Sequence, residues 1–301
     1  MSSLAASEAT EPLLHELMVG RERSADFYPE DRQLDVSGAR TVLQVSGLSL
    51  RGAFEPIDLH VRAGEIVGVG GLLDSGKSRL GKVIAGVLPP SAGVVALLGG
   101  PAGSPEIGAS VAAGLGYVPG ERLAEGMIAP FSVAWNISPG SGGDRATTRL
   151  GFWRTRREIQ VAKDYIESLR IRSAQPDTAC ARLSGGNQQK VVLSRWLSRD
   201  PGVLVLDNPT LGVDAGAKEE IYRVIRDLTD KGVGVVLITD ELLELIGLSN
   251  RILIIQHGQV VTEIDASPHA KPTERELVAW MMPGNPVDRH PTQSNTKKVA
   301  A

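Results

Sequence analysis

A short apolar strand that runs through a glycine-rich turn into a helix constrains this chain more than any other feature of its sequence. Residues 66–70 (IVGVG) are apolar enough for a buried strand, 71–76 form the turn, and 77–86 have the pattern of a helix. Such a turn directs backbone amides and the positive end of the helix at one point. The segment therefore predicts an anion-binding turn at the edge of a parallel sheet.

The residues of this turn match the spacing of a phosphate-binding loop. They are Gly71, Leu72, Leu73, Asp74, Ser75, Gly76, Lys77 and Ser78. In such a loop Lys77 would bridge the terminal phosphates of a nucleotide, and the Ser78 hydroxyl would hold Mg²⁺. The alternative is a glycine-rich turn with an incidental lysine, and the flanking strand and helix favour the phosphate site.

Asp207 follows a second buried strand, 203–206, and is the other candidate ligand of Mg²⁺. Ligands of open parallel sheets bind beyond the carboxyl ends of the strands, where Asp207 would lie beside the loop. Taken alone the pattern is weak, because many buried strands end in an aspartate.

The rest of the chain predicts an α/β fold. Antiparallel strands are expected at 41–48 and 57–61, ahead of a mostly parallel sheet whose strands alternate with helices. The later elements are a helix at 215–229, a strand at 233–239, a helix at 241–246, a hairpin at 252–264 and a helix that a Thr273–Glu276 capping box opens and 282 ends. The range 101–185 interrupts this alternation and is predicted to be an inserted, mostly helical subdomain. The folded domain would span 41–283, between a tail or linker at 1–40 and a disordered tail at 284–301.

The composition argues against several classes of function. Lys and Arg number 32 against 35 Asp and Glu, and this net charge of -3 is unlike that of a dedicated nucleic-acid binder. No apolar run approaches the roughly 20 residues that span a bilayer, so membrane contact is expected only through a partner. The single cysteine, Cys180, fits a reducing cytosolic compartment. The histidines lack the spacing of a zinc site.

The segment that begins at Leu183 carries the most specific pattern. It reads LSGGNQQK, in which Ser184 and the amides of the two glycines open a helix and form a second anion-binding end. This run resembles the signature sequence of ABC transporter ATPases, and LSGGNQQKVVLSRWL is similar to the second nucleotide-binding half of ribose- and galactose-type sugar importers. The resemblance implies that these residues cap the γ-phosphate of ATP held by the opposite domain of a head-to-tail dimer. The positions are Leu183, Ser184, Gly185, Gly186, Asn187 and Gln188.

The resemblance extends along most of the chain. AGEIVGVGGLL, GYVPGERLAEG and LDNPTLGVDAGAK match in order and spacing, and Asp214 falls at the D-loop, where the two domains touch. HELMVGRERSADFYPE looks like the connector after a first ATPase half, so that half is expected to be absent or separately encoded.

This resemblance implies a P-loop NTPase fold with ATP and Mg²⁺ as cofactors. The chain would be the ATP-binding subunit of an ABC importer, with sugars as the cargo, cytoplasmic and peripheral on the inner face of the plasma membrane. Its partners would be another ABC ATPase domain, as a homodimer or a separate first half, membrane permease subunits and, indirectly, a solute-binding protein.

Four positions depart from the pattern of this family. Asn208 stands where a catalytic glutamate is usual, and an amide cannot accept the proton of the attacking water, a role typically worth about 10²–10⁴ in rate. Asp240 occupies the place of the switch histidine. Gly120 occupies the Q-loop position, with Glu121 beside it as a candidate substitute. Asp74 replaces the middle glycine of the loop and brings negative charge toward the phosphates. We therefore expect an ATPase whose own site turns over weakly.

Two other functions stay open on these residues. Asn208 and Asp74 motivate a nucleotide-binding regulatory or scaffold subunit with little hydrolysis of its own. A soluble ABC ATPase of repair or translation is less consistent with the importer-type connector.

Phe54 is either an adenine-stacking residue or a core residue. The arginines at 154, 156 and 157 either contact a membrane partner or begin a solvated helix.

Overall fold

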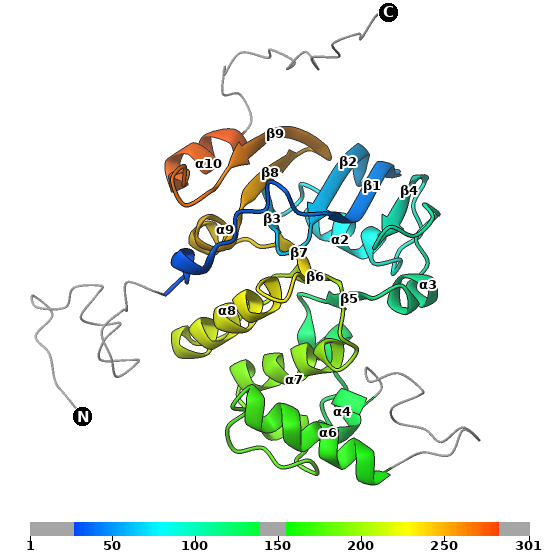
Figure 1. The fold of residues 1–301 in the computed structure, drawn as a ribbon, viewed down its shortest axis with the longest axis vertical. Coiled ribbons are helices and arrows are strands. Elements are labelled where there is room, and N and C mark those ends of the chain that lie inside the picture. Colours follow the sequence, from blue (N-terminus) through cyan, green and yellow to red (C-terminus); the bar gives the residue numbers. More distant parts are fainter. Residues whose placement is uncertain (1–26, 139–154, 283–301) are drawn as a thin grey trace, which may run out of the picture.

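The structure, a computed structural model, describes residues 27–138 and 155–282 (Figure 1). Most of the connector-like segment, 15–26, the expected tail at 284–301 and Arg154 lie outside the described residues. Within the described part, two sheets and the helices between and around them make an α/β fold, as the sequence predicts.

A six-stranded sheet lies at the centre, in the order β5-β6-β7-β3-β8-β9. The first five strands of this order are parallel, and β9 pairs antiparallel with β8. Both faces are buried: Val203 and Val205 of β6 enter one core, and Leu204 and Leu206 enter the other. The strands are β3 (Ile66–Gly70), β5 (Leu115–Val118), β6 (Val203–Asp207), β7 (Gly234–Ile238), β8 (Arg251–Gln256) and β9 (Gln259–Asp265).

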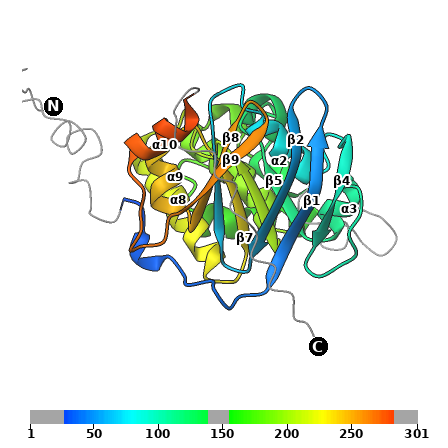
Figure 2. The ribbon, with the colours of Figure 1, turned by 90° about the horizontal axis from the view of Figure 1, so that it is seen from above.

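A smaller antiparallel sheet has the order β2-β1-β4, and its strands lie side by side in Figure 2. They are β1 (Thr41–Leu50), β2 (Phe54–Arg62) and β4 (Ala92–Leu97). Helix α2 (Lys77–Ile84) packs between the two sheets, where Leu80, Val83 and Ile84 share one core with both (Figure 1). The helix that follows the glycine loop is thereby fixed on two sides.

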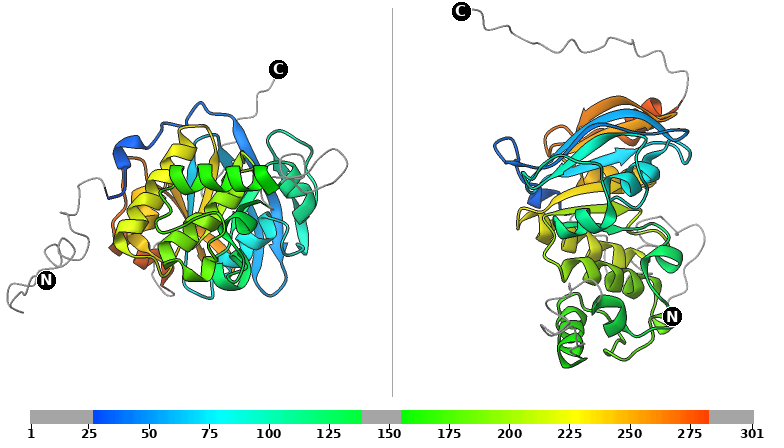
Figure 3. Two further views of the ribbon diagram at one scale, coloured as in Figure 1. Left: turned by 90° about the horizontal axis from the view of Figure 1, so that it is seen from below. Right: turned by 90° about the vertical axis from the view of Figure 1, so that its right-hand side faces the viewer.

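Helices cover the opposite face of the central sheet. α7 and α8 pack there, and α4 and α6 lie beyond α7 at the far end of the molecule (Figures 1 and 3). α9 and α10 form a third small core with β8, and α3 lies beside β5. Their bounds are α3 (Ile107–Ala112), α4 (Val133–Ile137), α6 (Thr155–Ser168), α7 (Gly185–Leu197), α8 (Ala215–Thr229), α9 (Leu242–Leu248) and α10 (Glu274–Met281).

The range expected to be an inserted helical subdomain, 101–185, differs from that expectation at one point. It contains β5, which pairs with β6 as a strand of the central sheet. All four residues of β5 are buried, so no alternation of polar and apolar residues marks the strand. The helices at the far end of the molecule therefore begin only after β5.

The end of the expected tail also differs, because residues 27–36 pack on the domain. Phe27 and Tyr28 form edge-on and tilted ring contacts with Tyr222 of α8. The guanidinium of Arg226, which is 1% exposed, donates to the carbonyl of Pro29 at 3.0 Å and to that of Gly247 at 3.0 Å. We call residues 27–36 the N-terminal strap; it packs on α8, and Arg226 of α8 links it to α9.

Two local predictions near the C-terminus are confirmed. The hairpin turns at His257 and Gly258, whose φ angles of 49° and 78° suit a two-residue type I′ turn. Thr273 and Glu276 form the capping box at the start of α10. Among the described residues, no helix has both the length and the apolar character that a membrane span requires.

The capping box gives a prediction for stability. Thr273→Ala removes the acceptor of the Glu276 amide hydrogen, so the free energy of unfolding should fall by about 1 kcal/mol. Thr273→Ser keeps that acceptor and should stay near the wild type. Urea unfolding of the three proteins measures the difference; an equal loss in both variants would show that methyl packing, and not the cap, is responsible.

Candidate functional site

The candidate residues on the central sheet gather because neighbouring parallel strands end at the same edge. The glycine loop follows β3, Asp240 lies just beyond β7, Asp207 ends β6 and Asn208 follows it, and Gly120 lies just beyond β5. These four strands are adjacent in the order β5-β6-β7-β3. Residues far apart in the sequence therefore meet at one edge, as the position of ligand sites in parallel sheets predicts.

The glycine loop is held by backbone contacts with two turns. Gly76 has a φ of 96°, and a Cβ there would lie 2.5 Å from the carbonyl oxygen of Ala53, so glycine is required. The Ser75 carbonyl accepts from the amide of Gly258 at 3.1 Å, which ties the loop to the β8–β9 turn. Asp74 and Leu73 are exposed, and Leu73 is 89% accessible.

Lys77 is buried within the loop, and oxygens surround its ammonium group. Its Nζ donates to the carbonyls of Gly71 and Leu72 at 2.9 Å each and forms an ion pair with Asp240 Oδ1 at 2.8 Å. The lysine side chain is only 2% exposed, whereas that of Asp240 is 42% exposed. The positive charge thus lies inside the loop with a carboxylate on its solvent side.

Ser78 and Asp207 form the pair that suits Mg²⁺. The Ser78 hydroxyl donates to Asp207 Oδ1 at 3.0 Å, which places a hydroxyl and a carboxylate oxygen side by side at the helix start. Burial raises the pKa of Asp207 and the Ser78 hydrogen bond lowers it, with burial the larger effect. Hard oxygen donors of this kind are the ligands that Mg²⁺ prefers, so these residues would hold it, and the ion would neutralise phosphate charge.

Asn208 is locked between its neighbours. Its φ of 44° lies in the left-handed region, which asparagine tolerates better than most residues. Its amide nitrogen donates to Asp207 Oδ1 at 3.3 Å, and its oxygen accepts from the backbone amide of Asp240 at 2.9 Å. The side chain links the ends of β6 and β7, and it offers no base to a water molecule.

Gly120 lies beside Asp207 and Asn208, whereas the described part of the chain shows no contact of the Glu121 side chain with them. A Cβ on Gly120 would lie 3.4 Å from the Asp207 carbonyl oxygen and 3.6 Å from the Cβ of Asn208. Glu121 is exposed. The Q-loop position is therefore next to the candidate Mg²⁺ ligand.

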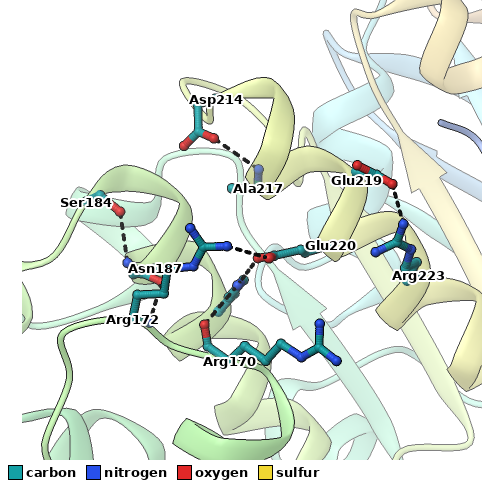
Figure 4. Close-up of polar contacts among 10 residues, drawn as sticks. Arg170, Arg172, Ser184, Asn187, Asp214, Ala217, Glu219, Glu220 and Arg223 are labelled. Atoms are coloured by element: carbon teal, nitrogen blue, oxygen red, sulfur yellow. Dashed lines mark hydrogen bonds and ion pairs between the residues drawn. The ribbon is translucent and has the colours of Figure 1, made fainter. Parts of the chain in front are cut away.

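The signature residues lie at the start of α7, against the start of α8 (Figure 4). Ser184 is exposed, and its hydroxyl accepts from Asn187 Nδ2 at 3.0 Å. Asp214 caps α8 by accepting from the amide of Ala217 at 3.0 Å. A Cβ on Gly186 would lie 2.4 Å from the Cβ of Ala217, so the close approach of the two helix starts requires glycine.

Cys180 and Arg122 contact the rest of the signature. Leu183 is 7% exposed and belongs to the core, and the Gln188 amide donates to the carbonyl of Cys180 at 3.2 Å. Arg122 donates to Gln188 Oε1 at 3.3 Å and to the carbonyl of Leu211 at 2.6 Å. A Cβ on Gly185 would lie 2.8 Å from this guanidinium. The arginine thus bridges the signature and the segment leading to Asp214.

An ion pair behind the signature, between a buried lysine and a partly buried glutamate, was not foreseen from the sequence. Lys190 of α7, 2% exposed, pairs with Glu220 of α8 and donates to the carbonyl of Arg170 at 3.3 Å. Arg172 also contacts Glu220, at 3.3 Å. The pair fixes α7 against α8, and nothing in the local pattern distinguishes these charges from surface ones.

Glu244 is a second buried charge that sequence reasoning missed. It is fully buried, and its carboxylate accepts from the Thr210 hydroxyl at 3.2 Å and from the Thr239 hydroxyl at 2.5 Å. It therefore joins the segments that follow β6 and β7. Burial raises the pKa of Glu244 to about 7, against the lowering by the Thr239 hydrogen bond. The only signal was an acidic residue within the otherwise apolar run LLELIGL.

The structure keeps the loop and the signature apart. The loop leads into the core between the two sheets, whereas the signature opens a helix on the opposite face of the central sheet. Phe54, weighed above as an adenine-stacking residue, is 4% exposed and lies in the core between the sheets. The two helix starts at which the sequence predicts anion binding are thus separate in the described part of the chain.

Comparison with known proteins gives consistent matches. A family model described as ABC transporter matches residues 54–211. Ribose import ATP-binding protein RbsA 2 of Rubrobacter xylanophilus is 41% identical over 82% of this chain and 46% of its own length. RbsA of Bacillus subtilis is 35% identical over 89% of this chain and 52% of its own length. The chain spans about half the length of the curated relatives it matches.

Solved structures match in fold. The ADP conformation of an ATP-binding cassette of an ABC transporter has a TM-score of 0.63 at 20% identity and covers 80% of this chain and 98% of its own. A dimeric, post-hydrolysis state of such a cassette, bound to ADP and Pi, has a TM-score of 0.64 at 20% identity, over 74% of this chain and 98% of its own.

The buried carboxyl group of Glu244 predicts a pH dependence of stability. Because its folded pKa is about 7 and lies above the unfolded value, the folded state holds a proton that the unfolded state loses first. Stability from this group is therefore present at low pH and is lost as the pH rises toward and through 7. Glu244→Gln should remove this part of the slope.

Urea unfolding of wild type and variant at pH 5 and pH 8 measures the effect. The stability of Glu244→Gln relative to wild type should increase by roughly 2–3 kcal/mol between these values. Glu167→Gln, at an exposed position of α6, is the control and should show no such change. Parallel behaviour of wild type and Glu244→Gln would contradict the assignment.

Proposed function

Because this chain belongs to the ABC transporter family, we propose that it is an ATP-binding domain that couples MgATP binding and hydrolysis to import of a sugar. The observation that carries the proposal is the meeting of Lys77, Ser78 and Asp207 at one sheet edge, apart from an exposed Ser184 at a second helix start. The first group suits the phosphates and Mg²⁺ of one nucleotide. The second suits a nucleotide that another domain brings.

In this proposal the loop binds the phosphates through its own groups. The amides of the loop and the start of α2 attract phosphate oxygens, Lys77 bridges the terminal phosphates, and Ser78 and Asp207 hold Mg²⁺. Asn208, Asp240 and Gly120 surround the same point at the ends of their strands. The positions from Gly71 to Gly76 act mainly through their backbone.

The partner is a second ABC ATPase domain, either another copy or a separate first half. Support comes from the exposed Ser184 and Asp214 and from relatives about twice as long as this chain. Those relatives are ribose import ATP-binding proteins, which motivates sugar as cargo. Membrane permease subunits, a solute-binding protein acting indirectly and a position on the cytoplasmic face of the membrane complete the proposal.

Turnover at the chain's own loop is proposed to be slow. Asn208 has no basic oxygen to accept a proton, and both ends of its amide are already hydrogen-bonded. The signature residues, in contrast, have no substitution of this kind and would serve the site of the partner. An asymmetric pair of sites follows, in which this chain completes a competent site while its own acts slowly.

Nucleotide binding is the first test. Lys77→Ala should weaken binding of MgATP by tenfold or more, on the order of the 1.4 kcal/mol or greater expected for a charge-assisted contact to phosphate. Lys82→Ala is the matched control, because Lys82 lies on the same helix and pairs with Glu125 instead. Isothermal titration calorimetry distinguishes them, and equal binding by both variants would reject the loop as the nucleotide site.

Hydrolysis is the second test, made with the chain and a partner domain whose own loop lysine is replaced. Only this chain's loop can then turn over. Asn208→Glu should raise turnover by about 10²-fold, because it supplies the general base. Asn208→Gln has the same length and backbone strain without a base, and should not. If both variants leave turnover unchanged, the weakness of this site has another cause.

The signature is tested with the intact partner. Ser184→Arg places a large cation where the opposite nucleotide would lie, and should abolish the turnover that depends on mixing the two proteins. Ser184 is exposed, so the variant should fold normally, which its melting temperature checks. Undiminished turnover would reject the head-to-tail arrangement. Binding without any turnover, even with the partner, would favour the regulatory or scaffold subunit.

A further inference from the structure

The ion pair between Lys77 and Asp240 uses the last free donor of the lysine. An ammonium group has three hydrogens to donate, and here two carbonyl oxygens and Asp240 Oδ1 accept them. Lys77 is 2% exposed and Asp240 is 42% exposed, so the carboxylate lies on the solvent side of the ammonium group. A phosphate that binds Lys77 from this side must therefore either displace the carboxylate or bind beside it.

The backbone of Asp240 is braced, so its carboxylate stays near this position. The amide of Asp240 donates to Asn208 Oδ1 at 2.9 Å. The preceding residue, Thr239, donates to the fully buried Glu244 at 2.5 Å and accepts from the amide of Glu241 at 3.1 Å. Rotation of the side chain alone moves the charge away from the lysine, but not away from the mouth of the loop.

The effect of this charge depends on how many phosphates the nucleotide carries. The loop lysine reaches the outermost phosphates, so a carboxylate beside it lies closest to the terminal group of a triphosphate. A diphosphate has no third phosphate there and carries less negative charge. Repulsion at such short range is therefore larger for the triphosphate.

We propose that Asp240 is a specificity-determining residue that makes this chain's own loop prefer a nucleoside diphosphate over the corresponding triphosphate. The inference rests on the proposed function, since it concerns the nucleotide bound at the loop. It adds a consequence for the asymmetric pair: the chain's own site holds its diphosphate while the site completed by the signature exchanges nucleotide.

The test compares binding of MgADP with binding of the Mg²⁺ complex of a non-hydrolysable ATP analogue, by isothermal titration calorimetry. Asp240→Asn removes the charge and keeps the size and a hydrogen-bond acceptor for Lys77. The wild type should bind the diphosphate more tightly, and Asp240→Asn should shift the ratio of the two dissociation constants roughly tenfold toward the triphosphate. Most of the shift should come from the analogue.

Asp164→Asn is the matched control for net charge, because Asp164 contacts Gln160 on α6, in the far helical end. It should leave both dissociation constants unchanged, and thermal melting should show that both variants fold. An equal change for the two nucleotides in Asp240→Asn, or none, would overturn the inference while leaving the proposed function intact. Absence of binding of either nucleotide by wild type and Asp240→Asn alike would reject the proposed function and this inference with it.

Discussion

The parallel register of four neighbouring strands is the constraint on which the rest of the structure depends. Asp207, the last residue of β6, pairs with Ile238 of β7, which brings the segment from Asn208 alongside that from Thr239. β3 pairs with the other side of β7 and delivers the glycine loop to the same edge. A shift of any pairing by one residue would turn the side chains of that strand to the opposite face and separate the loop from its carboxylates.

The loop and the signature, the two predicted anion-binding ends, differ in how many of their polar side chains are already paired within the chain. At the loop, Lys77 is paired with Asp240, the Ser78 hydroxyl is paired with Asp207, and Asn208 is hydrogen-bonded at both ends of its amide. At the signature, Ser184 is exposed and its hydroxyl accepts a hydrogen bond from Asn187. In the proposed function the first end must rearrange before a triphosphate binds, whereas the exposed Ser184 leaves the second open to a nucleotide from another domain. This difference is the structural basis of the proposed asymmetry.

Local patterns predicted much of this fold and of the candidate site. The loop between β3 and α2, the α8 helix, the β8–β9 hairpin and the capping box at Thr273 each depend on residues close together in the sequence, and each is present. Resemblance to a family added the signature and the positions of Asn208, Asp240 and Gly120. The last three residues gather at one edge of the central sheet because of the strand order, whereas the signature lies apart from them.

What could not be predicted depends on pairings between distant residues. β5 is only four residues long and wholly buried, so its sequence does not alternate. Lys190 finds Glu220, and Lys77 finds Asp240, across 30 and 163 positions of sequence, and nothing local selects these partners. The strap at Phe27 looked like a polar linker because its anchors, Tyr222 and Arg226, lie on α8. Burial of Glu244 is likewise a property of the packed domain.

The most direct measurement is a structure of this chain with a second ATP-binding domain, in the presence of Mg²⁺ and a non-hydrolysable ATP analogue. The account predicts that the amides of residues 71–78 contact one nucleotide and that Ser184 contacts a different one, held by the opposite domain. It would be contradicted if both segments contacted the same nucleotide, or if Ser184 faced solvent in the assembled pair.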